Sequence, residues 1–311
     1  MAAVKALRIR DVLGGEVAEL AQRVGPWRGV LLVLHAWTII ATCMVLAGLV
    51  HPAFAVLLVP IVGGRQLGLA ILMHDAGHGL LSNNRQRNDF VGRWIAGAPI
   101  GADLLSYRTY HFRHHKFTQQ DEDPDLVLSR PFPVSRASLL RKVMRDLSGL
   151  TFVKQKALLI AGAFTETDNR ARGAFRRTLM GWLLTNGSIS AATMLSLGWP
   201  ALTLWWLAQV TWLPLSLHIR NIAEHACTTT SADPFSHART TRASFLERVL
   251  IAPYWVNYHA EHHLFMGVPC YRLPVVHEVL GAKGYHDRMT IAASYAKVIR
   301  SVVASPSTQP N

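Results

Sequence analysis

The sequence is poor in cysteine and in acidic residues, and both shortages exclude classes of protein. The three cysteines, Cys43, Cys227 and Cys270, lie far apart and form no CxxC pair. This excludes a disulfide framework and a zinc-ribbon site. Only 19 acidic residues oppose 32 Lys and Arg residues, which gives a formal net charge of +13. Such a charge is typical of a nucleic-acid binder, or of a membrane protein whose loops meet anionic lipid.

Long apolar runs favour the membrane protein over the nucleic-acid binder. Residues 29–50 carry no charged side chain and suffice to cross about 30 Å of hydrocarbon at about 1.5 Å per residue. Residues 53–73 run back after a short turn. Residues 178–197 and 201–219 repeat this arrangement around a second turn, Gly198-Trp199-Pro200. The sequence therefore predicts an all-α integral membrane protein with four transmembrane helices in two hairpins, and no nucleic-acid partner.

The distribution of positive charge predicts how these spans are oriented. Neither outer turn contains Lys or Arg, so the positive-inside rule places the loops and both termini in the cytoplasm. We expect residues 1–28 to form a cytoplasmic or interfacial segment, residues 29–300 a single membrane domain with a cytoplasmic helical cap, and residues 301–311 a disordered tail. Arg65 is the one charge within the spans and should face the bundle interior or a polar end. The expected location is the bacterial inner membrane.

Nine of the fifteen histidines fall into four short motifs. Residues 74–78 (HDAGH) form an HxxxH pattern, residues 111–115 (HFRHH) and 259–263 (HAEHH) form HxxHH patterns, and Asn221 precedes His225 by four. On a helix, residues three and four apart share one face, with Cβ atoms about 5–6 Å apart. Each motif therefore directs its side chains at one region, and all four lie on the predicted cytoplasmic side.

The number and type of these side chains predict a metal centre. Neutral imidazole binds Fe, Zn, Cu and Ni, and eight or nine ligands are too many for one ion, so we predict two. The absence of cysteine from the motifs argues against iron–sulfur clusters and structural zinc. The scarcity of carboxylates distinguishes the site from the soluble di-iron proteins. The predicted ligands are His74, His78, His111, His114, His115, His225, His259, His262 and His263.

Three acidic residues lie beside these motifs on other helical faces: Asp75, Glu224 and Glu261. Carboxylates in such positions commonly accept a hydrogen bond from a metal-binding imidazole and so fix its orientation. The alternative is that they are ordinary surface residues, and the sequence leaves the two interpretations open.

The three boxes HDAGH, HFRHH and HAEHH closely resemble the histidine boxes of the membrane fatty acid desaturase and hydroxylase superfamily. Residues 118–125 (TQQDEDPD) resemble the acidic segment that commonly follows the second box, and residues 257–258 and 264–265 are similarly typical. The resemblance covers residues 30–280. It implies two iron ions on the cytosolic face, O₂ as co-substrate, and a metal-bound water held by Asn221. It implies no catalytic residue beyond the iron ligands.

The activity that this resemblance implies is the desaturation of a fatty acid or lipid acyl chain. Removing hydrogen from an unactivated methylene needs an oxidant that no side chain supplies, so the metal carries the chemistry while the protein positions the substrate. Lipid or hydrocarbon hydroxylases and ketolases have the same boxes and are the main alternative. A metal transporter would place its ligands inside the spans, and a zinc hydrolase of the HExxH type would need Glu in place of Asp75.

The sequence contains no recognisable haem-binding or flavin-binding segment. We therefore expect electrons from a separate ferredoxin, rubredoxin or cytochrome b5-like protein with its reductase. The basic residues Arg136, Arg141, Lys142 and Arg145 are a candidate docking surface for such an acidic donor. Contact with anionic membrane lipid explains the same residues equally well.

Overall fold

The structure, a computed structural model, describes residues 8–230 and 233–303 and is mostly helical, which confirms the predicted all-α class. The chain divides into two compact units. We call residues 1–25, 109–142 and 218–311 the polar unit, and residues 26–108 and 143–217 the apolar unit. The predicted tail lies outside the described residues from position 304 onward.

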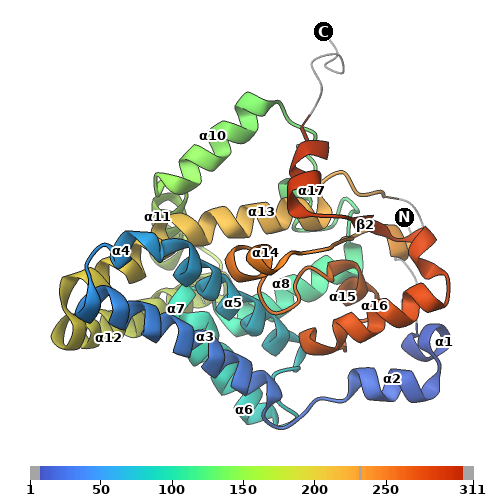
Figure 1. Cartoon of the computed structure of the whole chain (residues 1–311), viewed down its shortest axis with the longest axis horizontal. Coiled ribbons are helices and arrows are strands. Elements are labelled where there is room, and N and C mark those ends of the chain that lie inside the picture. The colour runs from blue at the N-terminus through green and yellow to red at the C-terminus, as the bar shows by residue number, and fades with distance from the viewer. Residues whose placement is uncertain (1–7, 231–232, 304–311) are drawn as a thin grey trace. The chain divides into compact units, whose positions relative to one another are not determined.

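The apolar unit contains the segments that the sequence predicted to be membrane spans (Figure 1). Its elements are α3 (Arg28–Val45), η1 (Leu46–Val50), α4 (Phe54–Leu57), α5 (Val59–His78), α6 (Arg85–Phe90), η2 (Val91–Gly97), α7 (Ala98–Ile100), α11 (Leu150–Thr165), α12 (Asn169–Leu207) and η3 (Ala208–Trp212). Of these, η1, η2 and η3 are π-helical.

The polar unit is built from short helices and a small sheet. Its elements are α1 (Ile9–Leu13), α2 (Gly15–Gln22), α9 (Leu126–Ser129), η4 (Pro234–Ser236), β1 (Arg239–Thr241), α14 (Phe245–Leu250), α15 (His259–Leu264), η5 (Cys270–Arg272), α16 (Leu273–Ala282), η6 (Tyr285–Arg288), β2 (Thr290–Ala292) and α17 (Tyr295–Ser301). Three helices contribute residues to both units: α8 (Leu104–Phe117), α10 (Arg136–Leu147) and α13 (Leu213–His225).

Close approach of backbones holds α3 against α5 in the apolar unit. A Cβ atom on Gly29, near the start of α3, would lie 2.5 Å from the backbone of Leu81, just after α5. The two helices therefore run antiparallel, as expected for a hairpin. Trp37 of α3 stacks on the fully buried Trp205 of α12 at a centroid distance of 5.7 Å, which joins this hairpin to the second one.

The label α12 covers two helices that meet at a kink. Gly198 has φ 76° and ψ −172°, a backbone conformation that other residues adopt only with strain. The kink lies at the turn that the sequence predicted. The two arms then lie side by side, because Trp205 Nε1 donates to Asn186 Oδ1 at 3.0 Å and Trp182 Nε1 donates to Gln209 Oε1 at 3.0 Å.

Helix length and composition identify one candidate membrane span among the described residues. Residues 28–50 form a 23-residue helix with a mean hydropathy of 2.3. The second predicted span is divided between α4 and α5, and it contains Arg65 and Gln66, which are 6% and 0% exposed. Arg65 thus faces the interior, which is one of the two placements that the sequence left open. The four-span architecture is not established by these criteria.

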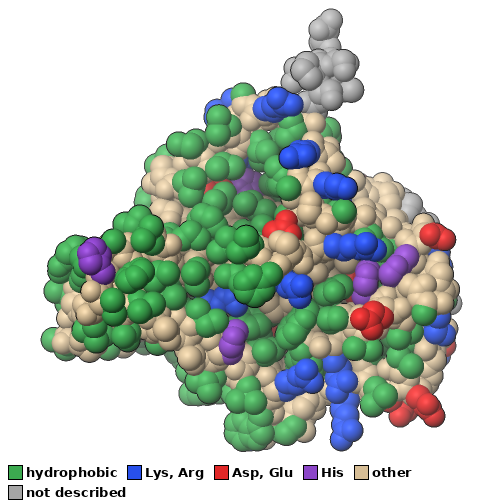
Figure 2. Space-filling view, in the orientation of Figure 1, with side chains coloured by type: hydrophobic (Ala, Val, Ile, Leu, Met, Phe, Trp, Pro, Cys, Tyr) green, Lys and Arg blue, Asp and Glu red, His purple; other side chains and the backbone are tan. Residues whose placement is uncertain are grey.

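Much of the surface of the apolar unit is nevertheless hydrophobic. Figure 2 shows apolar side chains gathered over α3, α4 and α12. Leu49 and Leu57 are 66% and 68% exposed, and Leu195 is 90% exposed. An apolar surface of this extent on a soluble monomer is unusual, and it marks a contact with membrane or with another protein.

The polar unit contains a feature that the sequence did not predict, a two-stranded parallel sheet formed by β1 and β2. Arg239 pairs in register with Thr290. The buried guanidinium of Arg239 donates to the carbonyl oxygens of Ala223 and Ala226 at 2.9 and 2.7 Å. These carbonyls lie at the end of α13, where the helix leaves backbone acceptors unsatisfied. Arg239 therefore fixes the end of the helix that carries His225.

Packing between α5 and η2 gives a stability prediction. A Cβ on Gly92 would lie 2.2 Å from the Cβ of Ala76, between the two histidines of the first box. Overpacking of this kind costs about 1–3 kcal/mol, so Gly92→Ala should lower the thermal unfolding midpoint in scanning fluorimetry. Gly187→Ala is the control, because nothing lies within 4 Å of its added Cβ. Equal midpoints for the two variants would contradict the close packing.

Candidate metal centre

Two helices position the second and third histidine boxes. The α8 helix begins where Asp103 Oδ2 accepts hydrogen bonds from the backbone N–H and the hydroxyl of Ser106 at 3.0 and 2.7 Å, a typical N-cap. It ends at Phe117 and so includes the whole second box. The third box forms most of α15. The spacing of three and four residues therefore does place each box on one helical face.

Four histidines of the polar unit converge in what we call the tetrahistidine cluster: His114, His225, His259 and His263. One nitrogen from each lies within 4.8 Å of the others. The Nε2 atoms of His259 and His225 are 2.9 Å apart, those of His263 and His259 are 3.0 Å apart, and those of His114 and His263 are 3.3 Å apart. Two nitrogens that bind one ion at about 2.1 Å and at right angles are separated by about 3.0 Å, so this spacing fits a shared metal ion.

The opposite nitrogen of each ring faces an oxygen atom. His114 Nδ1 lies 2.7 Å from Asp123 Oδ1, and His263 Nδ1 lies 3.2 Å from Thr118 Oγ1. His259 Nδ1 lies 3.4 Å from Glu224 Oε1, and His225 Nδ1 lies 3.4 Å from the carbonyl oxygen of His237. When Nδ1 donates its proton to such an oxygen, the lone pair stays on Nε2. All four rings can therefore present Nε2 to one metal ion.

The electrostatics of the cluster keep the imidazoles in the form that binds a metal. Burial, followed by the nearby His114, lowers the pKa of His225 well below its usual value, and burial with neighbouring histidines does the same for His263. Both rings are therefore neutral at pH 7. Burial also raises the pKa of Glu224 to about 7, although Arg220, at 3.2 Å, acts in the opposite direction.

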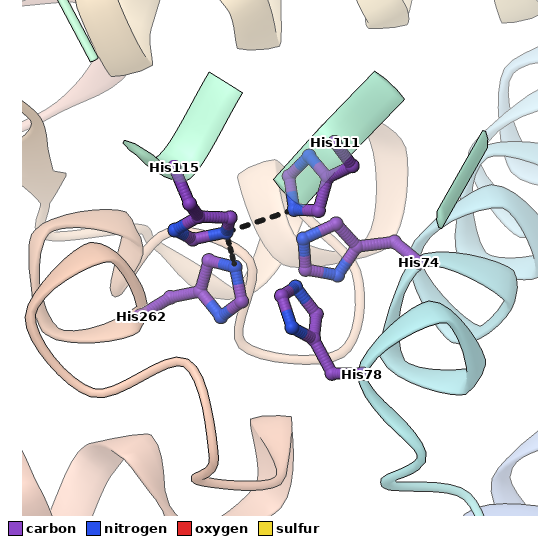
Figure 3. Close-up of side chains that lie close together, drawn as sticks. All are labelled: His74, His78, His111, His115 and His262. Atoms are coloured by element: carbon purple, nitrogen blue, oxygen red, sulfur yellow. Dashed lines mark hydrogen bonds between the residues drawn. The ribbon is translucent and has the colours of Figure 1, made fainter. Parts of the chain in front are cut away.

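Three further histidines of the polar unit form the trihistidine cluster: His111, His115 and His262. The Nε2 atom of His115 lies 2.9 Å from that of His111 and 3.0 Å from that of His262. Figure 3 shows these rings with both contacts as dashed lines. The second and third boxes are thus each divided, since each supplies ligand candidates to both clusters. This division follows from the way in which α8 and α15 face one another.

The first box belongs to the apolar unit. His74 and His78 end α5 one turn apart, with ring centroids separated by 5.0 Å (Figure 3). Asp75 Oδ1 lies 3.4 Å from His74 Nδ1. Burial, together with the nearby His74 and Arg108, lowers the pKa of His78 well below its usual value, so this imidazole is also neutral. That both residues bind a metal stays a prediction from the sequence pattern.

The remaining predicted site residues have other contacts. Asn221 Oδ1 accepts a hydrogen bond from Arg220 at 3.0 Å, and its water-mediated role stays a prediction. Glu261 is fully buried and lies 2.5 Å from His277 Nδ1, a residue outside the four motifs. Its second oxygen accepts a hydrogen bond from the Thr240 hydroxyl. Glu261 therefore holds α15 against α16 and β1.

The sequence interpretation did not assign the residues that orient the tetrahistidine cluster from outside the boxes. Asp123 lies within the acidic segment of residues 118–125, which Thr118 begins, and the pattern of that segment does not single out either residue. In the structure Asp123 is buried, and it also accepts from the backbone N–H groups of Gln119 and Asp125 at 2.9 Å each. The sequence feature that could have identified Asp123 is its position a few residues after a helix whose last turn contains His114 and His115.

The donors in both clusters are imidazole nitrogens with no bridging carboxylate among the described residues. Imidazole suits Fe, Zn, Cu and Ni, and the absence of thiolates disfavours iron–sulfur chemistry. The spacing of the Nε2 atoms and the hydrogen bonds to Nδ1 fit one transition-metal ion in the tetrahistidine cluster. The trihistidine cluster brings together three further imidazole nitrogens that could hold a second ion.

The chain is similar to known proteins over most of its length. A family model described as fatty acid desaturase matches residues 50–295. A dihydrorhizobitoxine desaturase of Bradyrhizobium elkanii is 24% identical over 91% of this chain and 82% of its own length. An sn-1 oleoyl-lipid 12-desaturase of Picosynechococcus is 24% identical over 86% of this chain and 80% of its own length. A beta-carotene ketolase of Paracoccus is 26% identical over 78% of this chain and 86% of its own length.

The contact between Asp123 and His114 predicts an effect on metal affinity. Asp123→Asn removes the charged acceptor, and loss of such a partner lowers metal affinity by about 10–100-fold. We expect the variant to lose metal at lower chelator concentration than the wild type, measured by elemental analysis after dialysis. Glu122→Gln is the matched control, since Glu122 is exposed beside it. Identical chelator profiles for Asp123→Asn and the wild type would refute this role.

Proposed function

The chain belongs to the fatty acid desaturase family, and from this premise we propose that it is an O₂-dependent membrane di-iron enzyme that introduces a C=C bond into a fatty acyl chain. The observation that carries the proposal is the tetrahistidine cluster, in which four Nδ1 atoms face oxygens and four Nε2 atoms converge. An all-imidazole centre of this kind suits iron, and redox chemistry is what the family membership leads us to expect.

We assign one iron ion to each cluster. The first would be held by the tetrahistidine cluster and the second by the trihistidine cluster. His74 and His78 are proposed as iron ligands from the sequence pattern of the first box alone. We further propose that Asn221 contacts one of the two iron ions through a bound water molecule. Iron held by these residues would supply the redox chemistry with O₂ and two external electrons that the removal of hydrogen from a methylene group requires. Asp75 and Glu224 orient their neighbouring imidazoles.

The contribution of the protein itself is to prepare the ligands and position the substrate. The oxygens that face Nδ1 fix the ring tautomers before the metal arrives, so little reorganisation is needed on binding. Burial keeps His225 and His263 neutral, and neutral rings do not repel a cation. Because no side chain is assigned a chemical step of its own, the reaction outcome depends on which methylene lies closest to the metals.

The proposed location is a bacterial inner membrane, crossed four times by the two hairpins with the histidine boxes on the cytoplasmic side. The hydrophobic surface of the apolar unit (Figure 2) and the charge of +13 support this topology. We propose electron delivery by a separate acidic protein that docks on α10. Its basic residues Arg136 and Arg141 are exposed there, although anionic lipid competes for the same surface.

Hydroxylation or ketone formation is the second candidate function, and the similarity to a beta-carotene ketolase favours it. Both reactions begin with the removal of one hydrogen atom. They diverge in whether a second hydrogen is lost or oxygen is inserted. Lipid analysis of a host with and without the gene distinguishes them, because desaturation lowers the product mass by two hydrogens and oxygenation raises it.

Iron content gives the direct test of the proposal. We expect about one iron ion per cluster in the purified protein. His114→Ala should lose the ion of the tetrahistidine cluster and His262→Ala that of the trihistidine cluster, so each variant should retain about half of the iron and form no unsaturated product. His51→Ala is the control, since His51 is exposed and outside every motif. Unchanged iron content in both cluster variants would end the proposal.

A further inference from the structure

The polar unit contains a cavity of about 840 Å³ to which no role has been assigned so far. It lies between α1 and α2 on one side and the ends of α8 and α15 on the other. A cavity of this volume is in the range of about 300–1,000 Å³ that binds small molecules. All of the residues that line it belong to the polar unit.

The cavity reaches both metal clusters. His115 of the trihistidine cluster and His263 of the tetrahistidine cluster line its wall, and their ring centroids are 4.4 Å apart. Both side chains are only partly buried. A molecule in this cavity therefore lies beside a ligand of each proposed iron ion, which is the position that a substrate needs for oxidation.

The wall next to these histidines is apolar. Phe112, Leu264, Phe265 and Met266 contribute to it, and Phe112 and Met266 are each 43% exposed. Phe112 lies within the second box, and residues 264–266 directly follow the third box. Apolar side chains in this position suit a hydrocarbon segment, because such a segment leaves water when it enters the cavity.

The side of the cavity formed by the N-terminal segment is basic. Arg8 and Arg10 line it, and Lys116 adds a third positive charge, whereas Asp11 is the one carboxylate of the wall. Arg10 forms an exposed ion pair with Glu19 at 3.0 Å. No carboxylate among the described residues forms an ion pair with Arg8 or Lys116. The wall therefore has positive charge available for an anionic ligand.

We propose that this cavity binds the substrate, and that the substrate is a small amphiphile with a free carboxylate and a short apolar chain. The carboxylate is recognised by Arg8, Arg10 and Lys116. The apolar chain lies along Phe112 and Met266 and so reaches His115 and His263. The inference rests on the proposed function and narrows it, because it selects a free acid over an acyl group esterified in a bilayer lipid.

Binding of hexanoate tests the charge selection directly. Iron-loaded protein in phosphatidylcholine nanodiscs is titrated with hexanoate, hexanol and hexylammonium, and binding is read from saturation-transfer NMR of the probe. We expect hexanoate to bind most tightly. The double variant Arg8→Ser/Arg10→Ser should weaken hexanoate binding about tenfold or more. The double variant Lys297→Ser/Arg300→Ser removes the same charge from exposed sites on α17 and should bind hexanoate like the wild type.

A second variant tests the apolar wall without removing a cation. Met266→Glu places a carboxylate on an exposed wall position, so it should repel hexanoate and bind hexylammonium more tightly than the wild type does. Equal binding of the three probes to the wild type, or an unchanged hexanoate affinity in Arg8→Ser/Arg10→Ser, would overturn the inference. Displacement of hexanoate by phosphatidylglycerol in the nanodiscs would also overturn it, since the cavity then holds a lipid headgroup.

These outcomes are separable from a failure of the proposed function. Iron content and oxidised lipid products are measured on the same wild-type preparation. If iron and unsaturated products are present but the hexanoate results fail, the cavity inference alone is wrong. If hexanoate binds as expected but the protein holds no iron, the binding site stands and the oxidation assigned to it does not.

Discussion

The proposed metal centre depends on the contacts of the Nδ1 atoms: hydrogen bonds for His114, His225 and His263, and an ion-pair contact with Glu224 for His259. A neutral imidazole has one protonated and one unprotonated nitrogen, and only the unprotonated nitrogen binds a metal. In the tetrahistidine cluster, Asp123, Thr118, Glu224 and the carbonyl of His237 each face one Nδ1 atom. These oxygens come from separate segments, so the contacts that orient the four rings form only when the polar unit is folded.

Buried carboxylates serve this arrangement in two different ways. Asp123 and Glu224 contact histidines of the cluster directly. Glu261 contacts His277 and Thr240 instead, so its role is to hold α15 to its neighbours. A buried carboxylate is costly unless it is paired or hydrogen-bonded, and here the partners that satisfy it also set the position of a histidine box. Asp123 and Glu224 thus contact the clustered histidines, and Glu261 contacts the neighbours of the helix that carries the third box.

The proteins to which the chain is similar differ in what their names say they act on: dihydrorhizobitoxine, an oleoyl lipid and beta-carotene. The similarity to proteins with such different names does not identify the substrate of this chain. In this chain, the N-terminal helices α1 and α2 and the residues after the third box line the cavity of the polar unit that we propose as the substrate site.

The sequence by itself determined the helical class and the sharing of a helical face by the histidines of each box, because these follow from composition and from the periodicity of one helix. It also supplied the family resemblance. The burial of Arg65, one of two placements that the sequence allowed, was decided by the tertiary structure. The tertiary structure decided how the boxes divide between clusters. His114 joins His259 and His263, whereas His111 and His115 join His262, and this depends on the relative rotation of α8 and α15. Thr118 contacts His263, which lies 145 residues further along the chain. Arg239, which holds the end of α13, lies in a strand that the sequence pattern did not predict. Such contacts form only when distant segments pack together, so the local spacing of residues along the chain does not predict them.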